Sequence, residues 1–235
     1  MAEVIIALDL SGADARRLLD RVPEARWVKV GSVLFTREGP GLARDLVSRG
    51  LSVFLDLKWH DIPNTVAGSV EAALGLGVAM ATVHTLGGSD MLKAAAAAAG
   101  PRLALVGVTV LTSHSREGYG AAVGREQLVV LDEVGRLADS ARAAGLRGVV
   151  CSPLEVQTVR GRLPREAWVV VPGIRRSGDP AGDQVRTATP AEAAAAGATH
   201  LVVGRPILAA ADPRSVYLEM AAAARQGAGS RPPTA

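Results

Sequence analysis

Short apolar runs alternate with helix-forming segments eight times along this 235-residue chain. The apolar runs are rich in Val, Leu and Ile and are bounded by turn residues, which indicates strands that are buried on both faces. We expect strands at residues 4–10, 27–31, 51–58, 80–86, 103–111, 148–152, 168–171 and 200–203. The expected helices cover about 14–22, 41–48, 63–74, 94–99, 125–144 and 190–196, and two more begin near 154 and 215.

This order of elements predicts the architecture. Alternating strands and helices form a parallel sheet with the helices packed outside it, and eight such units favour closure into a barrel. We therefore predict an α/β fold, a single (β/α)8 TIM barrel over residues 1–225. The last ten residues, 226–235, are expected to be a disordered tail.

Charge and composition argue against several classes of protein. The net charge of +3 is spread along the chain, so a nucleic-acid-binding surface is not expected. No apolar run is long enough to span a membrane, and no signal peptide is apparent at the N-terminus. The single cysteine, Cys151, excludes an intramolecular disulfide and fits a small core residue in a reducing compartment. We expect a cytoplasmic protein.

Charged residues crowd the place where the third predicted strand ends. The segment 56–65 reads Asp-Leu-Lys-Trp-His-Asp-Ile-Pro-Asn-Thr and follows a buried apolar run. Side chains alternate along a strand, so Asp56 and Lys58 lie on the same face. Because buried charges are costly unless they are paired, this pattern suggests a catalytic centre.

The use of lysine supports the same interpretation. Lys and Arg together number 26, but the lysines are Lys29, Lys58 and Lys93 alone. Lysine shifts its pKa readily, whereas arginine does not give up its proton in proteins. Chance can explain one lysine in an arginine-rich chain, but two lysines inside apolar strands favour a role in proton transfer or as a compact charge.

Other candidates lie at or near the ends of predicted strands, because active sites of such barrels form where the strands end. These candidates are Asp9 after the first strand, Lys29 in the second, Thr112 after the fifth, Arg175 after the seventh, and Gly204 and Arg205 after the eighth. Loops after strands seven and eight often bind phosphate in such barrels. The planar guanidinium groups of Arg175 and Arg205 are suited to bind phosphate oxygens. Residues 176–183, followed by Gln184, are expected to form a loop that closes over a phosphate.

Each candidate has a simpler alternative. Asp61 could cap the third helix, and Asp9 could be a turn residue. Lys29 could extend outward, and Arg175 and Arg205 could be solvated loop charges. No His, Cys or carboxylate set has convincing metal-ligand spacing, so we predict no metal site.

Taken together, the motifs resemble those of the orotidine 5′-phosphate decarboxylase family. The segment 56–65 is similar to the signature of that family. The other matching motifs lie, in order, at 7–9, 28–31, 108–113, 172–175, 183–184 and 203–207. The resemblance therefore extends over nearly the whole chain.

The resemblance implies cofactor-free decarboxylation of orotidine 5′-phosphate to UMP and CO2 in de novo pyrimidine biosynthesis. Lys58 would be the acid that protonates a C6 carbanion, with Asp56 beside the substrate carboxylate. Asp61 would reach into the neighbouring subunit of a homodimer. The implied catalytic residues are Lys58, Asp56, Asp61 and Lys29. The implied substrate-binding residues are Asp9, Lys29, Asp61, Ile62, Thr65, Thr112, Arg175, Gln184, Gly204 and Arg205.

Two other functions would fit parts of the same pattern. Magnesium-dependent sugar-phosphate enzymes, such as 3-keto-L-gulonate 6-phosphate decarboxylase, resemble the barrel and share the DxKxxD core. They tend to carry a carboxylate where this chain has Lys29, and a lysine argues against a cation site. A non-catalytic nucleotide-binding barrel would keep the arginines but would not need the array of Lys29, Asp56, Lys58 and Asp61.

Overall fold

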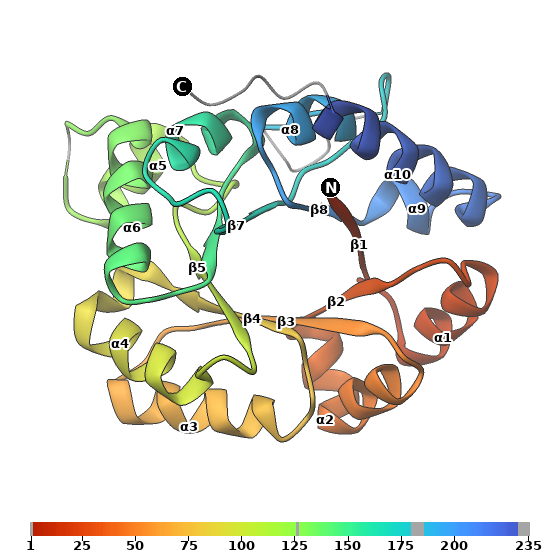
Figure 1. The fold of residues 1–235 in the computed structure, drawn as a ribbon, viewed down its shortest axis with the longest axis horizontal. Coiled ribbons are helices and arrows are strands. Elements are labelled where there is room, and N and C mark those ends of the chain that lie inside the picture. Colours follow the sequence, from red (N-terminus) through yellow and green to blue (C-terminus); the bar gives the residue numbers. More distant parts are fainter. Residues whose placement is uncertain (1, 126, 180–185, 230–235) are drawn as a thin grey trace.

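The predicted barrel is confirmed. The computed structural model describes residues 2–125, 127–179 and 186–229, in which eight parallel strands close into a barrel in the order β1 to β8. Helices surround the strands in a ring (Figure 1). Each strand pairs with its sequence neighbours, and β1 closes the sheet against β8. The carboxyl ends of all eight strands therefore meet on one face.

The strands are β1 Glu3–Ala7, β2 Trp27–Gly31, β3 Ser52–Trp59, β4 Met80–His84, β5 Ala104–Val108, β6 Gly148–Val150, β7 Trp168–Val171 and β8 His200–Val203. Four predicted strands, the first, fourth, fifth and sixth, extended two or three residues too far at their carboxyl ends. The apolar runs there continue into loops, such as Val110 and Leu111 after β5. These loop residues line a cavity instead of pairing in the sheet.

The α-helices are α1 Gly12–Arg21, α2 Ser32–Ser48, α3 Pro63–Leu74, α4 Gly88–Ala99, α5 Arg116–Ala122, α6 Val130–Ala143, α7 Val156–Arg160, α8 Pro190–Ala196, α9 Arg205–Leu208 and α10 Pro213–Gly229. Two 3-10 turns, Thr85–Gly87 and Pro153–Glu155, precede α4 and α7. The predicted second helix covered only the later part of α2. Gly39, with φ of 67°, breaks α2 before Pro40, and the part before this break was not predicted.

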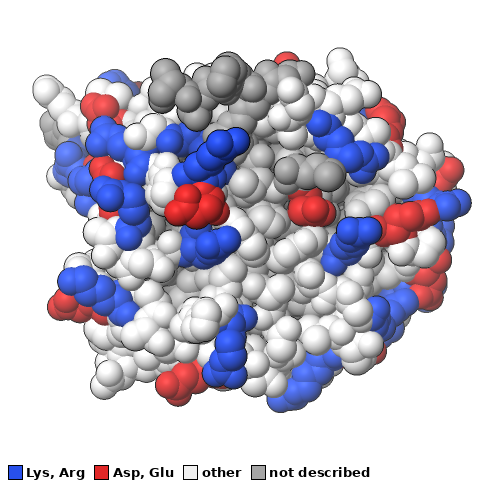
Figure 2. Space-filling model, in the orientation of Figure 1, with Lys and Arg blue, Asp and Glu red and all other residues white. Residues whose placement is uncertain are grey.

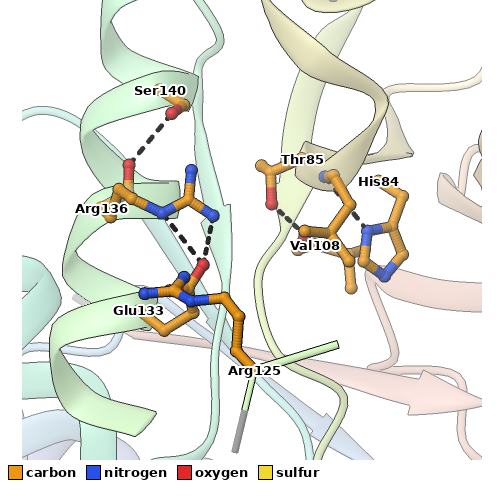
Figure 3. A network of polar contacts seen from close by, with 8 residues as sticks. His84, Thr85, Val108, Arg125, Glu133, Arg136 and Ser140 are labelled. Atoms are coloured by element: carbon orange, nitrogen blue, oxygen red, sulfur yellow. Dashed lines mark hydrogen bonds and ion pairs between the residues drawn. The ribbon is translucent and has the colours of Figure 1, made fainter. Parts of the chain in front are cut away.

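The helix predicted over about 125–144 is present as α6, Val130–Ala143, but it begins later than predicted. The structure has α5, then a connection, and α6 begins only at Val130. Glu133 in the first turn of α6 is buried and accepts hydrogen bonds from Arg125 and Arg136 (Figure 3). Arg136 is the main cause that lowers the pKa of Glu133. The ion pair with Glu133 ties Arg125 to the first turn of α6.

The expected boundary of the C-terminal tail was also wrong. Helix α10 runs through residues 226–229, while residues 230–235 lie outside the described residues. The alanine-rich sequence before this point favours a helix. Gly227 is buried, and a Cβ there would lie 2.1 Å from the carbonyl oxygen of Ala191 in α8. This close approach holds the end of α10 on the barrel.

The amino end of the barrel is filled by an aromatic cluster. Trp27, Trp168 and His200 begin β2, β7 and β8, and the rings of Trp168 and His200 lie 4.4 Å apart. Burial lowers the pKa of His200 to about 4, so the ring is neutral at pH 7. Above the cluster lie the apolar side chains Ile5, Phe54, Met80, Val106, Val170 and Val202. The hollow part of the barrel is therefore at the other end.

Charges on the outside are mixed in sign. Figure 2 shows Lys and Arg interspersed with Asp and Glu on the face that it displays. Ion pairs such as Arg16–Asp45 and Arg214–Glu24 join neighbouring helices and loops. In the described part of the chain, no helix is both long and apolar enough to cross a membrane.

Candidate active site

A cavity of about 480 Å³ opens where the strands end. Its floor is apolar and comes from the barrel interior, with Phe54, Val150 and Val202 among the residues that line it. Its walls carry charged residues from β2 and β3 and from the segments after β1, β7 and β8. The predicted residues in this lining are Asp9, Lys29, Asp56, Lys58, Thr112, Arg175, Gly204 and Arg205. One cavity thus brings together eight of the predicted site residues.

Charges of alternating sign meet on one wall of the cavity. We call this the charged wall, and it consists of Asp9, Lys29, Asp56 and Lys58. The Lys58 Nζ donates to Asp56 Oδ1 at 2.9 Å, and the other oxygen of Asp56 lies 3.7 Å from Lys29 Nζ. Lys29 Nζ also lies 3.4 Å from Asp9 Oδ1. The side chains of Lys29 and Asp56 are only 12% and 13% exposed, so Lys29 points into the cavity and not outward. The buried carboxylate of Asp56 is stabilised by an ammonium on each side.

The backbone that carries Lys58 is irregular. Leu55 pairs with Ala81 of β4, but the next registered pair is Trp59 with Val83, so β3 bulges between them. Lys58 adopts a φ of 51°, and it is the one non-glycine with positive φ among the described residues. A left-handed conformation is unfavourable for lysine and typically costs about 1–2 kcal/mol. The bulge turns the ammonium of Lys58 towards Asp56 and the cavity.

Two histidines lie behind this wall. His60 and His84 stack with their ring centres 5.5 Å apart. Burial lowers the pKa of His84 to about 4, and the nearby charges of His60 and Lys58 add to that effect. His84 is therefore neutral at pH 7 and accepts a hydrogen bond from the Leu86 N–H. The two rings therefore pack against each other outside the cavity lining.

The opposite side of the cavity suits an anion. Gly173, with φ of 80°, turns the chain after β7, and Arg175 beyond it is only 7% exposed. Gly204 follows β8, and a Cβ on it would lie 3.7 Å from Asp9 Oδ2. The neighbouring Arg205 is exposed at the cavity mouth. Gln184 and residues 180–183 of the expected loop lie outside the described residues.

Three predicted residues do not line this cavity. Asp61, Ile62 and Thr65 are exposed, and Ile62 is 67% exposed although it is apolar. Asp61 accepts from the N–H of Ile62, while α3 has no side-chain cap, so the helix-cap alternative is wrong. Asp61 and Ile62 line a separate, open hollow together with Leu86 and Gly87.

Sequence reasoning missed a polar residue beneath the charged wall. Thr82 of β4 is fully buried, and its Oγ1 lies 3.1 Å from Asp56 Oδ1 and 2.8 Å from the Lys58 backbone N. The available signal was a threonine at the centre of the apolar strand 80–84.

A second missed group ties strand ends together. Arg186 forms an ion pair with Glu155, whose side chain is 1% exposed, and also donates to the Leu111 carbonyl at 3.4 Å. Leu111 lines the cavity. Arg186 and Glu155 lie 31 residues apart in different segments, and the sequence alone gives no sign that they meet.

Within residues 2–125, 127–179 and 186–229, no group of three His, Cys, Asp or Glu side chains is placed to hold a metal ion. The ammonium of Lys29 lies within 4 Å of the carboxylates of both Asp9 and Asp56. It occupies the position from which a metal ion would bind these two carboxylates.

Known proteins resemble the chain over nearly its full length. The family described as orotidine 5′-phosphate decarboxylase / HUMPS matches residues 2–220. A Halorhodospira halophila protein named orotidine 5′-phosphate decarboxylase is 49% identical over 227 residues, covering 93% of this chain and 94% of that protein. A Moorella thermoacetica protein of the same name is 46% identical over 230 residues, covering 94% of this chain and 91% of that protein.

A solved structure agrees with these relatives. The crystal structure of orotidine 5′-phosphate decarboxylase from Lactobacillus acidophilus is 36% identical, with a TM-score of 0.84. The match covers 95% of this chain and 99% of that one. Fold, motifs and sequence identity agree, and the chain belongs to the orotidine 5′-phosphate decarboxylase / HUMPS family.

Proposed function

We propose that this protein decarboxylates orotidine 5′-phosphate to UMP and CO2, as a step of de novo pyrimidine biosynthesis. The observation that carries the proposal is the Lys58 ammonium, held 2.9 Å from the Asp56 carboxylate in the barrel cavity. Relatives at 44–49% identity that bear this name support it. The test is the loss of orotidine absorbance when the substrate meets the purified protein.

In the proposed reaction, Lys58 acts as the acid. The bond between C6 and the carboxylate breaks, CO2 leaves, and the electron pair stays on C6. The Lys58 ammonium stabilises that charge and then transfers a proton from Nζ to C6 to give UMP. Such a fixed charge is effective because it needs no reorganisation during the reaction. Lysine suits the role, since it carries a transferable proton at neutral pH and arginine does not.

Asp56 would have two roles in this scheme. Its contact with Lys58 fixes the ammonium, and its carboxylate would lie beside the departing carboxylate of the substrate. Repulsion between the two carboxylates would be relieved as CO2 forms, which is a form of ground-state destabilisation. The Lys29 ammonium lies 3.7 Å from the second oxygen of Asp56 and so helps to fix the position of this carboxylate.

The remaining predicted site residues would bind the rest of the substrate. We assign Asp9 and Lys29 to the ribose hydroxyls and Thr112 to the pyrimidine. The 5′-phosphate would bind to Arg175, Gln184, Gly204 and Arg205. Binding energy from this remote group can help to stabilise the transition state.

We further propose a homodimer in which Asp61, Ile62 and Thr65 complete the neighbouring site. All three are exposed in one subunit and lie outside its cavity. The hollow that Asp61 and Ile62 share with Leu86 offers apolar surface for a second copy. A carboxylate that serves its own subunit would be expected in the cavity with Lys58.

Mixing two inactive variants tests this sharing. Asp61→Ala and Lys58→Ala subunits, combined and allowed to exchange, should form hybrids with one doubly altered site and one intact site. We therefore expect activity approaching one quarter of the wild-type value per subunit, about half the mixture being hybrid dimers. Each variant alone serves as the control. A mixture that stays as inactive as its components would contradict sharing of Asp61.

No cofactor or metal is part of the proposed reaction. Lys29 places a positive charge where the magnesium-dependent sugar-phosphate enzymes would need a ligand for their cation. We propose the cytoplasm as the compartment, because Cys151 is a free, buried thiol and because the substrate is a small metabolite. No nucleic-acid or membrane partner is proposed.

A further inference from the structure

Thr82 lies where two parts of the charged wall meet. It is on β4, is 0% exposed, and its hydroxyl is within hydrogen-bond distance of both Asp56 and Lys58. The contact to Asp56 joins two side chains, at 3.1 Å between Oγ1 and Oδ1. The contact to Lys58 joins the threonine side chain to the backbone N, at 2.8 Å. A single hydroxyl thus touches the lysine's backbone and its partner carboxylate.

The direction of the two bonds follows from the groups involved. The Lys58 N–H can only donate, so Thr82 Oγ1 accepts from it. The Asp56 carboxylate accepts, so the hydroxyl proton of Thr82 is directed at Asp56 Oδ1. The same oxygen of Asp56 receives the Lys58 ammonium at 2.9 Å. Backbone, hydroxyl, carboxylate and ammonium therefore form a closed ring of contacts.

This ring coincides with the bulge in β3. From Leu55 to Trp59 the strand advances four residues while β4 advances two, from Ala81 to Val83. Lys58 falls within that stretch and adopts its positive φ there. An amide N–H that leaves the sheet ladder at a bulge needs another acceptor, and Thr82 supplies it from inside the barrel wall.

We infer that Thr82 is a positioning residue that holds Lys58 and Asp56 in the geometry needed for proton transfer. The inference rests on the proposed function, because it concerns the same reaction. Thr82 does not line the cavity, so it acts through these two residues and not on the substrate. Its hydroxyl should therefore affect kcat far more than KM.

Three variants separate this role from simple packing. Thr82→Val keeps the shape and removes the hydroxyl, while Thr82→Ser keeps the hydroxyl and removes a methyl group. Thr85→Val is the matched control, since Thr85 is 3% exposed and donates to the Val108 carbonyl at 2.6 Å without touching Asp56 or Lys58 (Figure 3). Both valine variants thus lose a buried hydroxyl, one in the middle of β4 and one directly after it.

The variants are assayed with orotidine 5′-phosphate under steady-state conditions, and folding is checked by circular dichroism. We expect Thr82→Val to lower kcat by about 10- to 100-fold with KM changed less than about threefold, because small misplacements of reacting groups have effects of this size. Thr82→Ser keeps the hydroxyl, and Thr85 contacts neither Asp56 nor Lys58, so neither change should misplace the reacting groups. Both variants should therefore keep kcat within about threefold of the wild-type value. If Thr82→Val does not fold, Thr82→Cys, with its weak S–H donor, takes its place and should lower kcat in the same direction.

The outcomes are distinct. Wild-type kcat in folded Thr82→Val overturns the inference, and so does an equal loss in Thr85→Val or in Thr82→Ser. Turnover by the wild type in the same assay is measured first. Its absence would overturn the proposed function, whereas turnover with a normal Thr82→Val enzyme would overturn only the role of Thr82.

Discussion

Lys58→Ala should lower kcat/KM for orotidine 5′-phosphate by roughly 10⁴-fold or more, because it removes both a proton donor and a fixed charge. The Lys58 side chain lines the cavity and is 39% exposed, and Asp56 Oδ1 accepts a hydrogen bond from its ammonium. Steady-state rates of decarboxylation in the two proteins provide the measurement. Lys58→Arg should be nearly as impaired, since arginine keeps the charge but does not release its proton.

Lys93 provides the control for this experiment. It is the third lysine of the chain, and it is exposed on α4, away from the cavity lining. Lys93→Ala should leave both kcat and KM close to their wild-type values. A Lys58→Ala protein that is folded and turns over normally would refute the assignment of the acid.

Arg205→Ala should lower kcat/KM by roughly 10²–10³-fold, the range expected when one partner of a hydrogen-bonded charge pair is removed. Arg205 is exposed at the mouth of the cavity, next to Gly204 and on the same side as Arg175. Its planar guanidinium can bind phosphate oxygens in a bidentate way. The decisive comparison uses two substrates, orotidine 5′-phosphate and orotidine, which lacks the phosphate.

If Arg205 acts through the phosphate, the variant and the wild type should have the same low kcat/KM towards orotidine. Arg17→Ala serves as the control, because Arg17 lies on the outer helix α1 and is 71% exposed in its side chain. An unchanged kcat/KM for the phosphorylated substrate would contradict the phosphate assignment. An equal loss of kcat/KM towards both substrates would show that Arg205 does not act through the phosphate.

The barrel could be predicted because its signal is repeated. Each strand is a short run of Val, Leu and Ile, and strands buried on both faces require such runs. Strand ends were less predictable, since apolar residues such as Val110 and Leu111 continue past β5 to line the cavity. The end of α10 was missed because Gly227 looks unfavourable for a helix until its close packing on α8 is seen.

The charged wall was predictable for a related reason. Asp56 and Lys58 are separated by two positions on a strand, so alternation places them on one face. Lys29 joins them because β2 and β3 are neighbours in the sheet. Position at the carboxyl ends of strands was enough to gather these groups in one cavity.

The local distortion of β3 could not be predicted in this way. Strand alternation assumes a regular backbone, whereas Lys58 lies at a bulge with a positive φ. The partner that accommodates the bulge, Thr82, is a single buried hydroxyl on another strand. The contact depends on the shift in register at the bulge, and the alternation of side chains along a strand gives no sign of such a shift.

The most direct measurement is turnover of orotidine 5′-phosphate by the wild-type protein after treatment with EDTA. Decarboxylation is followed by the loss of orotidine absorbance and by the appearance of UMP. The arrangement of Lys58, Asp56 and Lys29 predicts full turnover without added metal. No turnover of this substrate, together with magnesium-dependent turnover of a keto-sugar phosphate, would contradict the proposed function.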